Sequence, residues 1–94
     1  MNSKITIGKV TFDHTSYDRE GDVLYLHVGE PEAAAQTDET PEGHVVRFDE
    51  TGAVIGLTLI NARWLLNRDG SVLVSLPEQR KIEAKELEPA FNGT

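Results

Sequence analysis

The feature that most constrains this chain is a hairpin pattern in residues 45–60 whose returning strand is apolar on both faces. A first strand, Val45–Asp49, leads into the turn Glu50-Thr51-Gly52, and a second run, Val54–Ile60, follows. A three-residue loop ending in glycine is typical of a type I turn closed by a left-handed residue. Alternation along the second run places Ile55, Leu57 and Leu59 on one face and Val54, Thr58 and Ile60 on the other. Because both faces are apolar, we expect both to be covered.

Alternating apolar and polar residues predict further strands on either side of this hairpin. The clearest is Val23–Val28, with Leu24, Leu26 and Val28 facing the core and Val23, Tyr25 and His27 facing away. The run Ile5–Phe12 changes phase at Gly8, which indicates a bulge or bend in one strand. Residues 71–76 form another strand, stopped by Pro77, and a short extended piece at 80–83 and a helical turn at 85–87 follow.

Three segments are less clearly patterned. Residues 16–22 are a polar turn, and residues 29–42 are an acidic loop with one helical turn or a weak edge strand. Residues 61–70 fit either a helix capped by Asn61 and ended by Gly70, or a strand followed by an Asp69-Gly70 hairpin turn. We favour the helix, because the segment lacks β-branched residues and a helix would cover the second face of the hairpin.

These elements predict a β-rich α+β fold, with a four- to five-stranded, mainly antiparallel sheet and one or two short helices. With 94 residues, the chain is expected to form a single domain over residues 1–94. A hydrophobic content of 38% and a charged content of 27% fit a globular protein rather than a disordered one.

Composition also narrows the possible partners and cofactors. The net charge of −7 disfavours nucleic acid, because such binding depends on Lys and Arg neutralising phosphates. No apolar run approaches the length of a membrane helix, and the N-terminus lacks the apolar stretch of a signal peptide. The chain has no cysteine, which removes disulfides and thiolate chemistry. We therefore expect a cytoplasmic protein that binds neither nucleic acid nor membrane and needs no cofactor.

Two segments resemble the signatures of a family of short bacterial proteins. Residues Tyr17-Asp18-Arg19-Glu20-Gly21-Asp22-Val23-Leu24-Tyr25-Leu26 resemble an opening signature, Tyr-Asp-x-x-x-Asp-x-Leu-Tyr-hydrophobic, of the family catalogued as domain of unknown function 2283. The hairpin segment Val45–Leu57 resembles its second signature, in which an Asp-rich turn with glycine precedes a hydrophobic-Gly-hydrophobic run. The resemblance covers about residues 10–62 and implies strands with one short helix, without an established activity. The family's usual acidic residue after the second glycine is replaced here by Thr58, so no role is carried over to that position.

No catalytic or metal-binding site is expected from the spacing of the ionisable residues. Asp18, Glu20 and Asp22 place three carboxylates within five residues, but Gly21 stands at the wrong position for a calcium loop. A turn whose Asp side chains accept backbone N–H groups is the simpler interpretation. His14, His27 and His44 lack the spacing of a metal site. Two alternatives stay open: a small enzyme using Asp18, Asp22, His27 or Asp49, and a metal-binding domain built around Asp18, Asp22 and His27.

Two further residues are candidates for packing or binding. Gly56 is expected to let a large neighbour, such as Tyr25 or Trp64, lie against the backbone. Trp64 is the one tryptophan, and it is either a core residue lying over the sheet or an interface anchor.

The function expected from the sequence is a non-catalytic protein-interaction module. Its partner is either a second copy of the chain or a small basic protein attracted by the acidic surface, as in an antitoxin-like role. The candidate motif or interface residues are Tyr17, Asp18, Asp22, Tyr25, His27, Asp49, Gly52, Gly56 and Trp64.

Overall fold

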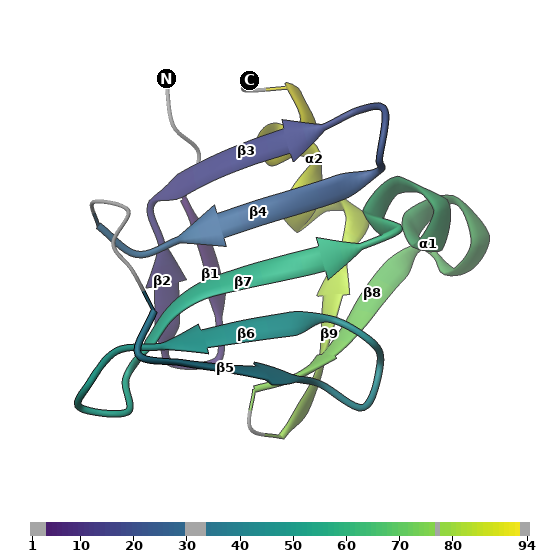
Figure 1. Ribbon diagram of the computed structural model, residues 1–94. Helices are drawn as coiled ribbons and strands as arrows, with labels where there is room; N and C mark the ends of the chain where they lie inside the picture. The colour runs from purple at the N-terminus through teal and green to yellow at the C-terminus, as the bar shows by residue number, and fades with distance from the viewer. Residues whose placement is uncertain (1–3, 30–33, 77, 93–94) are drawn as a thin grey trace.

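The computed structural model describes residues 4–29, 34–76 and 78–92 and shows two layers. One layer is a five-stranded antiparallel sheet in the order β3-β4-β7-β6-β5 (Figure 1). Its strands are β3 (His14–Asp18), β4 (Val23–His27), β5 (Gln36–Glu39), β6 (Val45–Phe48) and β7 (Val54–Ile60). The predicted β-rich α+β fold, including the weak edge strand and the central hairpin, is confirmed.

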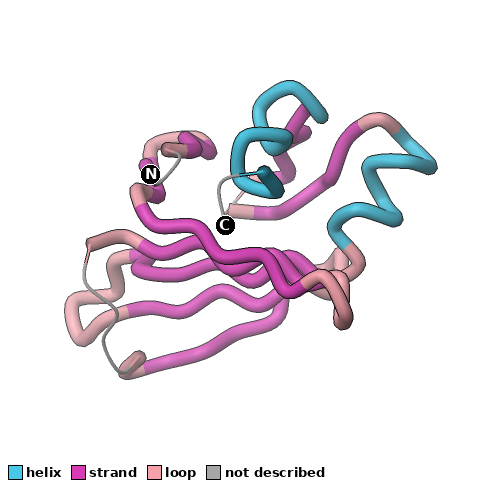
Figure 2. Tube along the Cα trace, turned by 90° about the horizontal axis from the view of Figure 1, so that it is seen from above, coloured by secondary structure: helices cyan, strands magenta, loops and turns pink. Residues whose placement is uncertain are grey.

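The second layer lies on one face of this sheet (Figure 2). It contains two short hairpins and two helices, in chain order β1 (Ile5–Ile7), β2 (Val10–Phe12), α1 (Ala62–Asp69), β8 (Ser71–Ser75), β9 (Gln79–Glu83) and α2 (Ala84–Asn92). Neither helix of the described residues is long and apolar enough to cross a membrane.

The hydrophobic core fills the space between the two layers. The sheet contributes Leu24, Leu26, Leu57 and Leu59, which are at most 1% exposed, as the alternation predicts. The second layer contributes residues from every one of its elements, among them Phe12, Ala62, Val72, Ile82 and Leu87. The chain's own N-terminal hairpin and C-terminal third therefore cover one face of the sheet, which we call the inner face.

The N-terminal prediction was wrong in one respect. Residues 5–12 are a hairpin rather than one bulged strand, because Gly8 and Lys9 form the turn that reverses the chain. The change of phase that indicated a bulge arises because Ile5 pairs with Phe12, so both side chains face the core. The expected polar turn at 16–22 is also shorter, since Ser16, Tyr17 and Asp18 belong to β3.

The helix favoured for residues 61–70 is present, but its cap and its position differ from expectation. Asn61 adopts a left-handed conformation and makes no side-chain cap, while Gly70 ends the helix as predicted. α1 packs on β8 at the end of the sheet and does not lie over the second face of β7. At the C-terminus, α2 is longer than the predicted helical turn and continues through Pro89.

The second face of the five-stranded sheet is not covered by any described element (Figure 2). We call it the outer face. The expectation that a helix covers it was therefore wrong. A register shift between Arg47 and Phe48 also turns Val54 toward the core, which leaves Thr58 and Ile60 as the outward residues of β7.

Candidate functional site

The outer face is the first candidate site, and strand register arranges its side chains in three rows across the sheet. The first row is His14, His27, Gly56, Arg47 and Thr37; the second is Ser16, Tyr25, Thr58, Val45 and Glu39; the third is Asp18, Val23 and Ile60. We call His14, His27 and Arg47 the basic row, since they are the ionisable members of the first row. The surface thus passes from a basic end, through an apolar middle, to an acidic residue at the far corner.

Arg47 and His27 of the basic row lie on either side of Gly56 in β7. A Cβ atom at this position would lie 3.5 Å from Arg47 Nη1 and 3.6 Å from His27 Cδ2, which is ordinary van der Waals contact. The expectation that Gly56 admits a close approach by Tyr25 or Trp64 was therefore wrong: Arg47 and His27 are its neighbours, and the space would also hold an alanine. Arg47 also donates a hydrogen bond to Thr58 Oγ1 at 3.4 Å, and His27 Nδ1 donates to the Gly29 carbonyl at 3.2 Å. These contacts hold Arg47 and His27 in place.

Tyr25 is the most prominent apolar side chain of the outer face. It is 40% exposed, whereas its cross-strand neighbour Thr58 is 5% exposed. Val23, Val45 and Ile60 surround this pair and are half-buried. A small sheet face with one exposed aromatic ring among aliphatic side chains is the kind of surface that another protein covers.

The opening motif has a structural role that the sequence did not reveal. Asp22 Oδ1 accepts hydrogen bonds from the Tyr17 hydroxyl at 2.8 Å and from Arg63 N–H at 2.8 Å, and its Oδ2 accepts one from Trp64 N–H at 3.0 Å. Asp22 therefore caps α1 from a distant turn, in place of Asn61. Burial raises the pKa of the Tyr17 phenol, and the hydrogen bond to Asp22 and its charge raise it further.

The remaining residues of the two motifs shape turns. Asp49 Oδ1 accepts hydrogen bonds from Thr51 N–H, Thr51 Oγ1–H and Ala53 N–H at 2.6 to 3.0 Å, and Gly52 has the predicted positive φ of 86°. The Thr51 hydroxyl lowers the pKa of Asp49 most, and the Ala53 amide acts in the same direction. Asp18 lies at the outer-face end of β3. Thus the motif residues mostly hold the hairpins and α1 in place.

Trp64 is not the core residue that one interpretation predicted. It is 54% exposed on α1, with the Arg68 guanidinium 4.6 Å from its ring centroid. It lies on the helix rather than on the outer face, so an interface through Trp64 would use a different surface from one through Tyr25.

The structure does not bring the candidate acids and histidines together. Asp18 and His27 lie at opposite ends of the outer face, Asp22 points to α1, and Asp49 lies in the β6–β7 turn. Within residues 4–29, 34–76 and 78–92, no three His, Cys, Asp or Glu side chains are placed to hold a metal ion. The pairing of His14 with His27 across β3 and β4 was missed, since it requires knowing that residues 14–18 form a strand.

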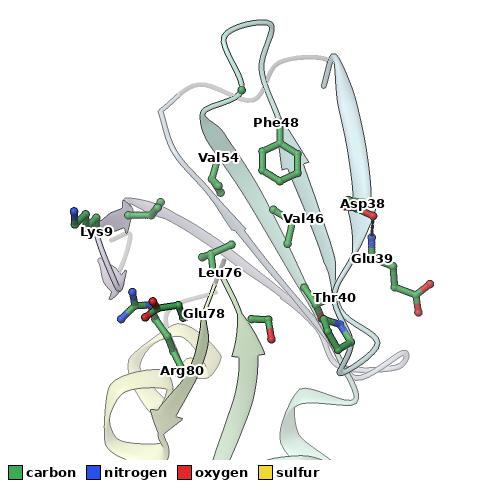
Figure 3. A pocket seen from close by; sticks show the side chains of 14 residues that line it. Lys9, Asp38, Glu39, Thr40, Val46, Phe48, Val54, Leu76, Glu78 and Arg80 are labelled. Atoms are coloured by element: carbon green, nitrogen blue, oxygen red, sulfur yellow. Dashed lines mark hydrogen bonds between the residues drawn. The ribbon is translucent and has the colours of Figure 1, made fainter.

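A second candidate site is a groove of about 790 Å³ that sequence analysis missed (Figure 3). Its apolar floor is Val46, Phe48, Val54 and Leu76, and it lies between the inner face of β6 and β7 and the tip of the β8–β9 hairpin. The polar side chains around this floor are those of Lys9, Asp38, Glu78 and Arg80, while Glu39 of β5 turns its side chain away from it. No local pattern in the sequence predicts the groove, because residues more than 60 positions apart, such as Lys9 and Glu78, line it together.

Comparison with known proteins identifies the family but adds no function. Comparisons with curated proteins and with solved structures found no match to this chain. A family described as protein of unknown function (DUF2283) matches residues 14–63, which span β3 through the start of α1. This segment contains the whole five-stranded sheet and more than half of the chain. The chain therefore belongs to the DUF2283 family.

Proposed function

We propose that this protein is a non-catalytic protein-interaction module that forms a homodimer through its outer sheet face. The observation that carries this proposal is the lack of any described element over the outer face, although it presents Tyr25 among Val23, Val45 and Ile60. On the opposite face the chain covers its own apolar sheet surface, since the second layer there buries Leu24, Leu26, Leu57 and Leu59. A second copy is the partner that is present wherever the protein is.

The size of the outer face fits a small dimer interface. Five strands about 4.8 Å apart, each about five residues long at about 3.4 Å per residue, give about 400 Å² of flat area per chain. Two such faces bury about 800 Å² of flat area, and more once side-chain relief is counted. Specific interfaces begin near about 1,000–1,200 Å² of total accessible surface. We therefore expect a weak dimer, with a dissociation constant in the micromolar range.

Charge selects between the two ways of packing this face on itself with two-fold symmetry. With the axis along the strands, the basic row would lie over the basic row of the partner. With the axis across the strands, through Tyr25 and Thr58, the basic row lies over the end that carries Asp18. The second arrangement places His14 of one copy opposite Asp18 of the other, with Glu39 as a like-charge contact at the rim.

Sedimentation velocity and light scattering test the dimer. We expect a mass near twice the 10.4 kDa of one chain at high protein concentration. Tyr25→Glu should yield a monomer, because it buries a charge at the centre of the interface. Trp64→Glu is the matched control, since it makes the same kind of change at an exposed aromatic residue on α1. A wild-type monomer at millimolar concentration would refute the proposal, and dissociation by Trp64→Glu alone would move the interface to α1.

A charge exchange tests the orientation. His14→Asp should weaken the dimer, because it places two carboxylates across the interface, and Asp18→Lys should weaken it, because it removes the acceptor opposite His14. The double variant His14→Asp/Asp18→Lys should restore dimerisation, since it places a carboxylate opposite an ammonium group. Failure of the double variant to restore what both single variants lose would reject this packing while leaving the choice of face intact.

A further inference from the structure

We infer that the free edge of β5, together with the adjoining groove, binds an extended basic peptide segment of a partner protein by strand addition. This inference goes beyond the proposed dimer, because the peptide would bind along the edge of β5 and over the inner face, whereas the dimer uses the outer face. It specifies a chemistry for a basic partner: a segment with large apolar side chains at alternate positions and Lys or Arg between them.

The backbone of β5 is the first part of the argument. β5 is the last strand of the sheet and pairs only with β6 among the described strands. The Thr40 N–H donates to the His44 carbonyl at 2.7 Å, and alternate residues of an antiparallel strand direct both backbone groups at the same neighbour. Thr37 and Glu39 therefore direct their N–H and C=O groups away from β6. These are the groups that an added strand uses.

Asp38 occupies part of this free edge in the unbound protein. Its Oδ1 accepts a hydrogen bond from the Glu39 N–H at 2.9 Å, and both residues are exposed (Figure 3). This carboxylate stands where the carbonyl oxygen of an added strand would lie. Displacement by a partner leaves the Glu39 N–H bonded to the partner's backbone and releases the Asp38 carboxylate from the β5 edge.

The groove gives the added strand its side-chain specificity. Side chains of a strand beside β5 alternate between the outer face and the inner face. Those on the inner face point over Asp38 toward the floor formed by Val46, Phe48 and Leu76 (Figure 3). Only a long apolar side chain such as Leu, Met or Phe reaches that floor, because a strand beside β5 lies two strand spacings, roughly 10 Å, from β6.

The charge around the groove indicates a basic occupant. Asp38 and Glu39 are adjacent residues of β5 itself, and in the described part of the chain neither forms an ion pair. Lys9, Glu78 and Arg80 lie at the end of the groove remote from β5 (Figure 3). The edge where the peptide enters is therefore acidic, and the net charge of −7 adds to the attraction.

Fluorescence anisotropy with a labelled eight-residue peptide of alternating Leu and Lys tests this inference on the full chain. The control peptide is the same sequence N-methylated throughout, which keeps side chains and charge but cannot pair as a strand. We expect the N-methylated peptide to bind at least about tenfold more weakly. Equal binding of the two peptides would overturn strand addition.

Matched protein variants locate the site. Thr37→Pro removes an outward N–H without breaking the β5–β6 ladder and should weaken binding about tenfold, whereas Thr37→Ala should not. Asp38→Lys/Glu39→Lys, which reverses the charge of the β5 edge, should weaken binding about tenfold at low salt. The control Glu20→Lys/Glu83→Lys makes the same change in net charge at exposed residues outside the groove and should have less than about a twofold effect.

Three further outcomes would overturn the inference. Equal loss in the two charge variants would show attraction by net charge alone. Loss of peptide binding in Tyr25→Glu, with Thr37→Pro unaffected, would place the peptide on the outer face. Dissociation of the dimer by Thr37→Pro, with Tyr25→Glu still dimeric, would assign the β5 edge to a second copy. If Thr37→Pro does not fold, the N-methylated peptide and the charge variants still decide the question.

Discussion

Among the side-chain hydrogen bonds of the described residues, those of Asp22 join the positions farthest apart in the sequence. Its carboxylate bonds Tyr17 in β3 and the first N–H groups of α1, whose residues Arg63 and Trp64 lie more than 40 positions away. We expect Asp22→Ala to lower the free energy of unfolding by about 2 kcal/mol, because it removes the helix cap and leaves the Tyr17 hydroxyl without its acceptor. Urea denaturation followed by circular dichroism measures this loss.

Two variants separate this role from a general effect of charge. Asp18→Ala removes a nearby exposed carboxylate and should change stability by less than about 0.5 kcal/mol. Tyr17→Phe removes only the hydroxyl and should cost about 1 kcal/mol. If Asp22→Ala were no more destabilising than Asp18→Ala, the carboxylate would not cap α1.

His44 makes stability depend on pH near neutrality. It is 1% exposed, and its Nδ1 accepts a hydrogen bond from the Ile60 N–H at 3.1 Å. Burial lowers its pKa below 6.5, while the charge of Glu42 and the Leu73 carbonyl act in the opposite direction. The unfolded chain therefore takes up a proton before the folded protein does.

This difference in pKa determines the direction in which stability changes with pH. Stability is highest above pH 6.5 and falls as the pH drops from 6.5 toward the lower pKa of folded His44. We expect His44→Asn, whose side-chain oxygen can still accept the Ile60 N–H, to flatten this part of the pH profile. Urea midpoints at pH 7.5 and 5.5 test it, and an unchanged slope in His44→Asn would contradict the assignment.

At the scale of elements, Glu42 connects the β5–β6 turn to the β8–β9 hairpin. Its carboxylate accepts hydrogen bonds from Ser75 N–H at 2.9 Å, Ser75 Oγ–H at 2.8 Å and Gln79 Nε2–H at 3.0 Å. These bonds lower the pKa of Glu42 to about 2 although burial opposes them. The folded pKa lies below the ordinary value, so this contribution is complete above about pH 4.5 and is lost as the pH falls toward 2.

Replacement of Glu42 should loosen this connection between elements. We expect Glu42→Gln to lower stability by about 1–2 kcal/mol at neutral pH, because hydrogen bonds to a charged acceptor become bonds to a neutral one. Amide hydrogen exchange should accelerate most at Ser75 and Leu76, beside the groove. Glu83→Gln, at an exposed residue of β9, is the control. Uniform acceleration along the chain would argue against a local connection.

The elements were predictable from sequence where their pattern is local. Alternation over residues 45–60 and 23–28 predicted the central hairpin and β4, since burial of one strand face has a period of two residues. Residues 5–12 were misread because a change of phase within eight residues fits a bulge and a tight hairpin equally well. The site was harder to predict: Gly56 indicated a close approach by an aromatic side chain, but strand register places Arg47 and His27 beside it instead.

At the scale of the whole molecule, the family segment and the core do not coincide. Residues 14–63 form the entire five-stranded sheet, yet most of the layer that covers its inner face comes from β1, β2, β8, β9 and α2 outside that segment. Tyr17 illustrates the dependence, because its ring packs edge-to-face on Phe91 of α2 at 4.5 Å. The sheet of this chain is therefore one half of a core.

This division predicts that residues 14–63 alone do not fold as a monomer. Without the second layer, Leu24, Leu26, Leu57 and Leu59 lose the partners that bury them, at a cost of about 1.5–3 kcal/mol for each side chain. That total, about 6–12 kcal/mol, is comparable with the whole stability of a typical small domain, about 5–15 kcal/mol. We expect the fragment to show a poorly dispersed NMR spectrum and no cooperative urea transition, whereas the full chain unfolds in one cooperative step. A folded, monomeric fragment would mean that the sheet is stable without its second layer, and that an uncovered outer face gives no reason to expect a partner.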